Sequence, residues 1–504
     1  MSWLVPLPIV LPLLGAALCI LAGRSRLAQR VIGASVLTAV VGVAAALLIA
    51  VDRDGTIVSR AGAWPAPLGI TLVADRFAAT MVIVASVMLL GVLLYAIAEP
   101  GAERNHVGFQ SVYLVLAAGV AGSFLTGDLF NLFVAFEMML TASYVLLTLG
   151  GRREQVRSGM TYVVISLLAS TLFVTSLALL YAATGTVNMA DLAVKLGELP
   201  SGVRSAFAVL LLVVFGIKAA LFPLFFWLPD SYPIAPSPIT AVFAGLLTKV
   251  GIYAIVRPQT LFFPAESRPG TLLLVLAGAT MVVGVLGALA QDDVKRILSF
   301  TIVSQIGYLA FGLGLFTVAG VAAAVFSMVH HIVVTTALFL ASGLIENVGG
   351  SSRLTALGGM VRKAPLMAAL FLIPSLSVAG IPPLSGFVSK FALIDAGIVA
   401  RQYPIVAVSL LVSLLTLLSM IRIWTGVFWN PIEEPSAPAD AVAPAMTDDG
   451  RAASRRPGML LSAAAVVVCS LAVAAAAGPL YGLSNRTAHD LLDRTDYIAE
   501  VSRR

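Results

Sequence analysis

Five charged side chains lie within long apolar stretches of this sequence, away from the loops that hold most of its charges. One is acidic, Glu137, and four are basic, Lys218, Lys249, Lys390 and Arg422. An ionised side chain at the centre of a membrane-spanning helix costs about 2.5–3.5 kcal/mol. If these stretches span a bilayer, each charge must form an ion pair, face water or change its protonation state.

The three lysines outnumber the single deep glutamate, so ion pairing alone cannot neutralise them. A desolvated lysine loses its proton near neutral pH far more readily than a lysine in water. Groups that gain and lose protons within a bilayer are the components of a proton relay. The alternative is that each charge forms a structural ion pair between helices. Arg422 lies six residues before the end of its stretch. Its side chain is therefore predicted to extend to the membrane interface instead.

Two adjacent histidines, His330 and His331, lie in the apolar stretch FSMVHHIVVTTALF. Adjacent residues on a helix point about 100° apart, so only one of them can face a given cavity. A histidine between two lysines would be a natural proton station, whereas a histidine satisfied by core contacts is the alternative. The hydroxyls of Ser327, Thr335 and Thr336 are predicted to provide water contacts on the same helix.

The composition indicates that membrane-spanning helices position these residues. Of 504 residues, 59% are hydrophobic and 11% are charged, and the mean hydropathy is +1.00, which is too apolar for a soluble globular protein. A hydrocarbon core about 30 Å thick requires about 20 apolar residues per helix, and the alternating segments of a β-barrel are absent. Fourteen spans are predicted, at 2–22, 31–51, 74–97, 108–126, 128–150, 159–183, 203–228, 236–257, 271–290, 297–317, 319–345, 365–397, 404–428 and 457–480.

Charge and cysteine usage exclude several other classes. The net charge of +6 lies mostly in loops, and nothing supports binding to nucleic acid. The two cysteines lie in apolar runs and indicate no disulfide framework, metal cluster or haem attachment. No basic residue precedes the first apolar run, so it is predicted to be a span and not a secretory signal. The excess of Lys and Arg in the loops of one side places both termini outside the cell.

Two of the lysines lie beside predicted helix breaks. Lys218 precedes Pro223 by five residues, and Lys390 follows Pro383 by seven. A proline frees a backbone carbonyl about one turn earlier, which is tolerable at this depth only against protein or a wet cavity. Broken helices in two corresponding spans are typical of an ion site in a transporter, although a merely kinked helix is the simpler alternative.

The spacing of the basic residues predicts an internal repeat. Lys218 and Lys390 are 172 residues apart, and Lys249 and Arg422 are 173 apart. Each pair is five spans apart, so the two five-helix units would be inverted relative to each other. The position equivalent to Glu137 has no acid, and Gln305 is among its nearest polar groups.

The predicted organisation is three N-terminal spans (1–107), a first repeat (108–257), a second repeat (258–428), a flexible cytoplasmic linker (429–457) and a last span with the tail (458–504).

Several long motifs resemble a known family. They are LFNLFVAFEMMLTASYVLL, GIKAALFPLFFWLPDSYPIAPSPITAVFAGLLTKVGIYAIVR, DDVKRILSFTIVSQIGYLAFG, HHIVVTTALFL and PSLSVAGIPPLSGFVSKF. They resemble the antiporter-like subunits shared by respiratory complex I, membrane-bound hydrogenases and the multisubunit Mrp-type sodium/proton antiporters. The likeness extends from about residue 108 to 430, and the length of the chain is similar to that of the Mrp D subunits.

The resemblance implies roles for individual residues. Glu137 and Lys218 would form the interacting acid and lysine pair, and Lys249 would be the connecting lysine. His331 or His330 would be the central histidine, and Lys390 the terminal lysine. Many relatives have a lysine one turn after the second histidine, where this chain has Thr335. The central relay would then depend more on histidine, water and hydroxyls.

The sequence therefore predicts an all-α polytopic membrane protein with two broken helices, acting as a proton-translocating subunit of a sodium/proton antiporter. Its expected setting is a bacterial inner membrane, its partners are lipid and other antiporter subunits, and no cofactor or metal is expected. One alternative is the proton-pumping arm of a complex I-like or hydrogenase-type oxidoreductase, although the chain has no cofactor motif. Another is a scaffold whose charges only hold helices together.

Overall fold

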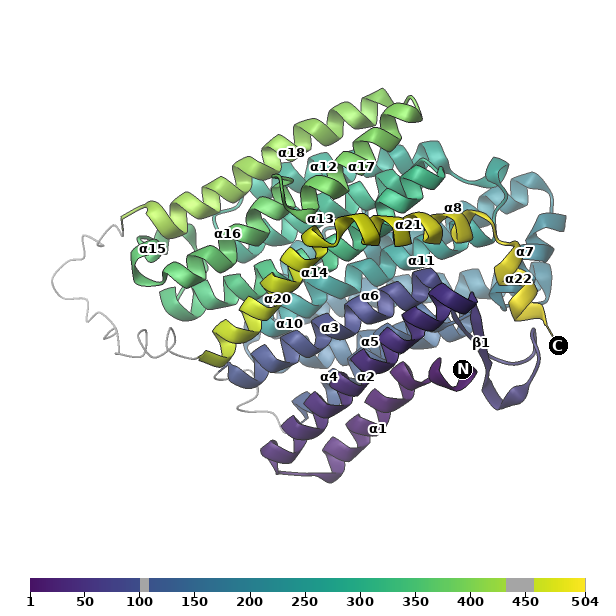
Figure 1. Cartoon of the computed structure of the whole chain (residues 1–504), viewed down its shortest axis with the longest axis horizontal. Coiled ribbons are helices and arrows are strands. Elements are labelled where there is room, and N and C mark those ends of the chain that lie inside the picture. The colour runs from purple at the N-terminus through teal and green to yellow at the C-terminus, as the bar shows by residue number, and fades with distance from the viewer. Residues whose placement is uncertain (100–107, 432–456, 504) are drawn as a thin grey trace.

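The fold is an all-helical bundle with one small hairpin (Figure 1). The computed structural model describes residues 1–99, 108–431 and 457–503, so most of the predicted linker 429–457 lies outside the described residues. Within these ranges, twelve helices are long and apolar enough to cross a bilayer, and two shorter apolar helices are Phe109–Leu125 and Pro365–Ala379. Together they coincide with the fourteen predicted spans, which confirms the fold class.

The N-terminal half contains the first spans, the first broken helix and the span after it. A hairpin pairs β1 with β2 in antiparallel register, Ile57 opposite Ala74 and Arg60 opposite Thr71. The elements in order are α1 (Leu7–Leu21), α2 (Arg26–Asp54), β1 (Ile57–Arg60), β2 (Thr71–Ala74), α3 (Arg76–Ala98), α4 (Phe109–Leu125), α5 (Leu129–Thr148), α6 (Arg153–Thr184), α7 (Met189–Glu198), α8 (Ser201–Ala219), α9 (Trp227–Ser231), α10 (Ser237–Val242), η4 (Phe243–Leu247) and α11 (Thr248–Leu261).

The C-terminal half contains the second broken helix and three helices after the predicted linker. Its elements in order are α12 (Gly270–Leu289), α13 (Val294–Gly314), α14 (Val318–Gly349), α15 (Met360–Lys363), α16 (Pro365–Ala379), α17 (Ser385–Val399), α18 (Tyr403–Trp424), η7 (Thr425–Trp429), α20 (Pro457–Ala475), α21 (Ala477–Leu492) and α22 (Thr495–Ser502).

Three spans form the interior of the bundle. The most apolar window of Ser237–Leu261, which contains α10, η4 and α11, is 100% buried, and those of α13 and α14 are 94% and 89% buried. The corresponding windows of α1 and α2 are only 33% buried, because one face of each packs inward. A helix buried on all sides keeps its polar side chains out of lipid, so these interior helices can hold Lys249 and the two histidines.

Both predicted helix breaks are present. Helix α8 is followed by Ala220, which has a φ of +60°, and the chain resumes helical structure at α9. Helix α16 is followed by Gly380, with a φ of +92°, and α17 begins at Ser385. A third irregularity was not predicted: η4 is a π-helical segment between α10 and α11, directly before Lys249. The inverted repeat itself stays a prediction.

Two basic residues that the sequence places at a span end or in a loop are buried, whereas Lys218 and Arg422 are only half-buried. Arg257, taken as the end of a span, lies inside α11 and is 5% exposed, and Lys295, assigned to a loop, lies in α13 and is 4% exposed. Arg257 forms a two-bond ion pair with Asp75, and Lys295 pairs with Glu346. Both were missed because they lie near the ends of apolar runs, where the sequence does not distinguish a buried side chain from an exposed one.

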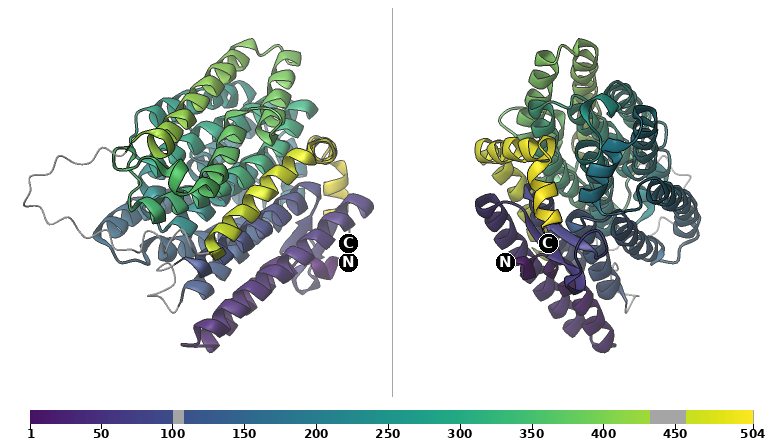
Figure 2. Two further views of the ribbon diagram at one scale, coloured as in Figure 1. Left: turned by 60° about the vertical axis from the view of Figure 1, so that its left-hand side comes forward. Right: turned by 90° about the vertical axis from the view of Figure 1, so that its right-hand side faces the viewer.

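The residues after 480, predicted as a tail, form ordered helices. Helix α21 lies across the outside of the bundle in contact with α14, α3 and α11, as Figures 1 and 2 show in yellow. Tyr481 packs edge-on against Phe326 of α14. Arg60 of the hairpin donates to the carbonyl oxygens of Val501 and Arg503. Helix α21 therefore covers part of α14, the helix that carries the two histidines.

Candidate functional site

Glu137 and Lys218 are linked through a serine hydroxyl. Glu137 lies in α5, Lys218 lies in the last turn of α8, and Ser170 comes from α6. The Ser170 hydroxyl donates to Glu137 Oε1 and accepts from Lys218 Nζ at 3.3 Å. Lys218 Nζ also donates to the Ser166 carbonyl oxygen at 3.3 Å. The Ser170 hydroxyl thus lies between the carboxyl group and the amine, and a proton can pass between them through it.

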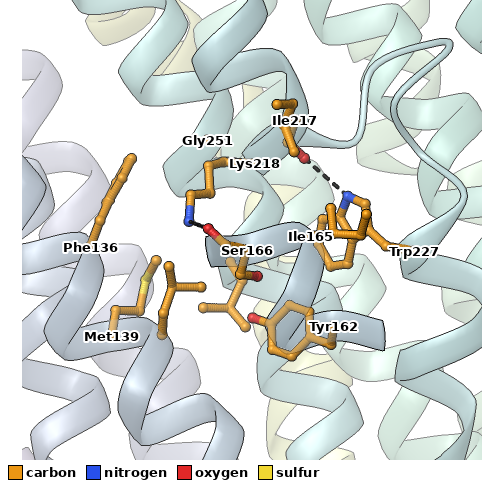
Figure 3. Close-up of a pocket in the computed structure, with 11 residues that line it drawn as sticks. Phe136, Met139, Tyr162, Ile165, Ser166, Ile217, Lys218, Trp227 and Gly251 are labelled. Carbon is orange, nitrogen blue, oxygen red and sulfur yellow. Dashed lines mark hydrogen bonds between the residues drawn. The ribbon is translucent and has the colours of Figure 1, made fainter. Parts of the chain in front are cut away.

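A small cavity borders this lysine. It has a volume of about 20 Å³, room for about one water molecule, and Figure 3 shows Lys218 and Ser166 among its lining residues. Aromatic rings close it, and Trp227 beyond the break donates through Nε1 to the Ile217 carbonyl oxygen at 3.0 Å. That bond satisfies a carbonyl near the end of α8. The break therefore places a small cavity and polar backbone groups next to Lys218.

The helix that carries Lys249 packs closely against the end of α8, where Lys218 lies. A Cβ atom on Gly251 would lie 2.6 Å from the Ala219 nitrogen and 2.8 Å from the Lys218 carbonyl carbon, so only glycine allows α11 to approach the end of α8 this closely. Lys249 is 2% exposed, and its Nζ donates to the Ala244 carbonyl oxygen at 2.6 Å. Ala244 lies in η4, where the π-helical hydrogen bonding leaves that carbonyl available.

The two histidines face different neighbours. His330 Nδ1 shares a hydrogen bond of 2.8 Å with the Ser385 hydroxyl at the start of α17. The Ser385 hydroxyl lies 3.3 Å from that of Ser377, on α16. The His331 ring is 4.7 Å from the His330 ring, and its Nδ1 is buried with no hydrogen-bond partner among the described residues. His330 is therefore the histidine that connects α14 to the second broken helix.

Lys390 uses the carbonyl that the second break frees. Its side chain is buried, and its Nζ donates to the Ala379 carbonyl oxygen, at the end of α16, at 3.0 Å. The ammonium group lies 5.0 Å from the centre of the Tyr308 ring, a cation–π distance. The neighbouring Ser389 hydroxyl shares a hydrogen bond of 2.6 Å with that of Ser327. Helices α13, α14, α16 and α17 thus converge on this lysine.

The remaining predicted residues divide into two groups. Gln305 and Thr335 line a cavity of about 10 Å³, and neither amide atom of Gln305 has a partner among the described residues. Thr336 donates to the Ile332 carbonyl of its own helix at 2.7 Å. Arg422 instead forms an ion pair with the exposed Asp292, and among the described residues it shares no hydrogen bond or ion pair with the other predicted residues. This position agrees with the predicted extension of its side chain toward the membrane interface.

The serines that connect the charges were not predicted from the sequence. Ser166 and Ser170 are four residues apart and share one face of α6, and Ser385 follows the break in GIPPLSGF. Serine is common in membrane helices, so only the neighbours in the fold identify these three. In the part of the chain that the structure describes, no group of three or more His, Cys, Asp or Glu could hold a metal ion. The chemistry that this site supports is proton transfer between amine, imidazole, hydroxyl and carboxyl groups.

Comparison with known proteins identifies the family. The transmembrane family of NADH:quinone oxidoreductases and Mrp antiporters matches residues 126–416. The chain is 46% identical to the D subunit of the Na(+)/H(+) antiporter of Alkalihalophilus pseudofirmus, over 99% of both chains. It is similar to a chain of the Mrp complex from Dietzia sp., with a TM-score of 0.90 and 36% identity over 100% of both chains. It is also similar to a chain of an archaeal membrane-bound sulfane sulfur reductase, with a TM-score of 0.86 and 28% identity over 99% of this chain and all of that one. This chain belongs to the NADH:quinone oxidoreductase/Mrp antiporter family.

Proposed function

We propose that this chain is the proton-translocating subunit of a multisubunit Na⁺/H⁺ antiporter. The observation that carries the proposal is the series of titratable groups inside the bundle, in which hydroxyls and carbonyls hydrogen-bond to most members. The series runs from Glu137 through Lys218 and Lys249 to the histidine pair and Lys390. The antiporter relative from Alkalihalophilus pseudofirmus and the Mrp complex support this assignment over a catalytic enzyme.

The first step of the proposed relay is a switch at Lys218. While Ser170 bridges the two groups, the negative charge of Glu137 stabilises the ammonium form of Lys218. Movement of Lys218 away from the bridge favours transfer of its proton toward Lys249, which α11 holds beside the same break. A change of about 1.4 kcal/mol in this balance alters the occupancy tenfold. Na⁺ binding elsewhere in the complex would be coupled to proton movement by shifting the balance between the protonated and deprotonated forms of Lys218.

The chain would act in a bacterial inner membrane, in contact with lipid and with other subunits of the complex. The loop charges favour both termini outside the cell. A second candidate is the proton-pumping arm of an oxidoreductase, which the likeness to the sulfane sulfur reductase chain favours. Purification of the intact assembly separates the two, because small hydrophobic subunits accompany an antiporter and iron–sulphur proteins accompany an oxidoreductase.

The function is tested by replacing Lys218 and Lys390 separately with alanine in the complete complex. In liposomes that contain a pH-sensitive dye, a Na⁺ gradient should drive proton movement in the wild type and not in either variant. If the charges only held helices together, the variants would be less stable but would retain their flux per assembled complex. That outcome would exclude the proposal.

The bridging role of Ser170 gives a smaller prediction. Ser170→Ala removes the hydroxyl that joins Glu137 to Lys218, so we expect proton movement to slow by about tenfold, the effect of about 1.4 kcal/mol on transfer. Thr171→Ala is the matched control, because the exposed Thr171 hydroxyl donates only to the Leu167 carbonyl of its own helix. Equal rates in the two variants would remove Ser170 from the relay.

A further inference from the structure

A larger, polar cavity lies at the junction of α3, α10, α13 and α14. Its volume is about 810 Å³, and it is lined by the ends of these helices and by neighbouring loops. No residue of the relay described above lines it. Its charged lining residues are Glu99, Arg152, Glu154, Asp230, Asp293, Lys295, Arg296, Glu346 and Arg353.

Most of the acids at the centre of this cavity have partners. Glu346 pairs with Lys295 and accepts from the Ser237 hydroxyl at 3.1 Å. Asp230 pairs with Arg296 at 3.3 Å. Asp293 caps the start of α13 by accepting from the Arg296 backbone nitrogen at 3.0 Å. These acids are therefore committed to interactions that hold the helix ends together.

Glu99 differs from them. It follows the last residue of α3, and its Oε1 accepts from the side-chain amide of Asn347 at 3.2 Å. Its Oε2 is buried, with no hydrogen-bond partner among the described residues. Burial raises the pKa of Glu99 to about 7, and the negative charge of Glu346 adds to this, while the Asn347 hydrogen bond and Lys295 oppose it. Near neutral pH, this carboxyl divides between its protonated and ionised forms.

The position of Glu99 connects the cavity with the buried relay. Asn347 lies on α14, the helix that carries the two histidines, and the Tyr95 hydroxyl of α3 donates to the Leu340 carbonyl of α14 at 3.3 Å. Ser237 begins the span that contains Lys249, which is twelve residues, or about 18 Å, further along. The buried hydroxyls of Thr240 and Thr248 lie on the same span, and Thr248 Oγ1 has no partner among the described residues.

We propose that Glu99 is the group that takes protons from water at this cavity and passes them toward Lys249. A hydronium ion would give its proton to the Glu99 carboxylate and leave as water. The proton would then move to a water molecule or hydroxyl on the way to Lys249, which restores the carboxylate. This inference rests on the proposed function, since it requires a relay that consumes the proton.

Protonation of Glu99 is measured without transport. A carbodiimide adds to protonated carboxyl groups, and peptide mass spectrometry of the intact complex treated across a pH series resolves the labelled residue. Labelling of Glu99 should be half-maximal near pH 7, as the raised pKa requires. Asn347→Ala should move the midpoint higher, because it removes a hydrogen bond to the ionised form. A midpoint near the ordinary glutamate pKa of about 4.3 would overturn the proposal.

Transport then tests the role of Glu99 itself. Glu99→Gln should slow proton movement by about tenfold near pH 8 and by less near pH 6, because a carboxyl with this pKa matters most where bulk protons are scarce. Glu154→Gln, which removes an exposed carboxylate from the same cavity, is the matched control. If Glu137→Gln abolishes transport and Glu99→Gln does not change it, Glu99 is not the acceptor and the relay stands. If neither variant changes transport, both proposals fail.

Discussion

Replacement of Glu137 by Gln should abolish Na⁺-driven proton movement, with a fall of about 100-fold or more. Glutamine keeps the shape of the side chain and can still accept from the Ser170 hydroxyl. It removes the negative charge that holds a proton on Lys218 and the group that could itself bind one. Because only the charge changes, the variant is expected to insert and assemble normally, and the defect should lie in transport.

The measurement compares initial rates of proton movement in liposomes that contain equal amounts of assembled complex. Glu137→Asp keeps the charge on a shorter side chain and should retain part of the rate. Glu266→Gln is the control for loss of a carboxylate, because Glu266 is exposed and pairs only with Arg204 at the surface. If sodium-dependent proton movement is undiminished in Glu137→Gln, then Glu137 takes no part in proton transfer and the proposed relay is wrong.

The spans were predictable because a bilayer imposes a length on every apolar helix. The breaks after Lys218 and before Lys390 were predictable as well, since prolines mark them. The π-helical segment before Lys249 was not, because FAGLL contains no residue that requires it. The segment makes a carbonyl available to the buried amine of Lys249, and that amine is buried only because other helices surround the span.

The titratable members of the candidate site could be found from the sequence, whereas their connections could not. A lysine in an apolar run is rare enough to be noticed by type alone. The serines that join Glu137 to Lys218 and His330 to α17 are ordinary residues of membrane helices, and their hydrogen bonds follow from how α6 and α17 pack. The helices after residue 480 were missed because their apolar residues cover the outside of the bundle and form no run long enough to span.

The buried ion pair that sequence analysis missed gives the largest predicted effect on stability. Asp75 and Arg257 are each 5% exposed and are joined by two bonds, of 2.5 and 2.8 Å. The guanidinium group also lies 5.3–5.5 Å from the ring centres of Phe77, Tyr253 and Tyr497. Tyr497 belongs to α22, so the pair holds α3, α11 and the C-terminal end of the chain together.

Asp75→Asn should destabilise the protein by about 3–5 kcal/mol, because it leaves the Arg257 charge buried without a counter-ion. The helix cap need not be lost, since asparagine can accept from the Ala78 nitrogen as Asp75 does at 2.8 Å. The effect is measured as a fall in the unfolding temperature of the purified protein in detergent. Asp52→Asn is the matched control: its ion pairs with Arg76 and Arg486 are about a third exposed, and pairs of this kind contribute about 0–1 kcal/mol.

A double variant separates the charge from the packing around it. In Asp75→Asn with Arg257→Met, the unpaired charge is gone and an apolar side chain lies among the same three rings, so much of the lost stability should return. If the double variant is as unstable as Asp75→Asn alone, the loss comes from the cap or from packing, and the account given for the pair is wrong. Recovery would show that the cost lies in burying one charge without a counter-ion. The relay lysines meet the same constraint by donating hydrogen bonds to carbonyl and hydroxyl oxygens.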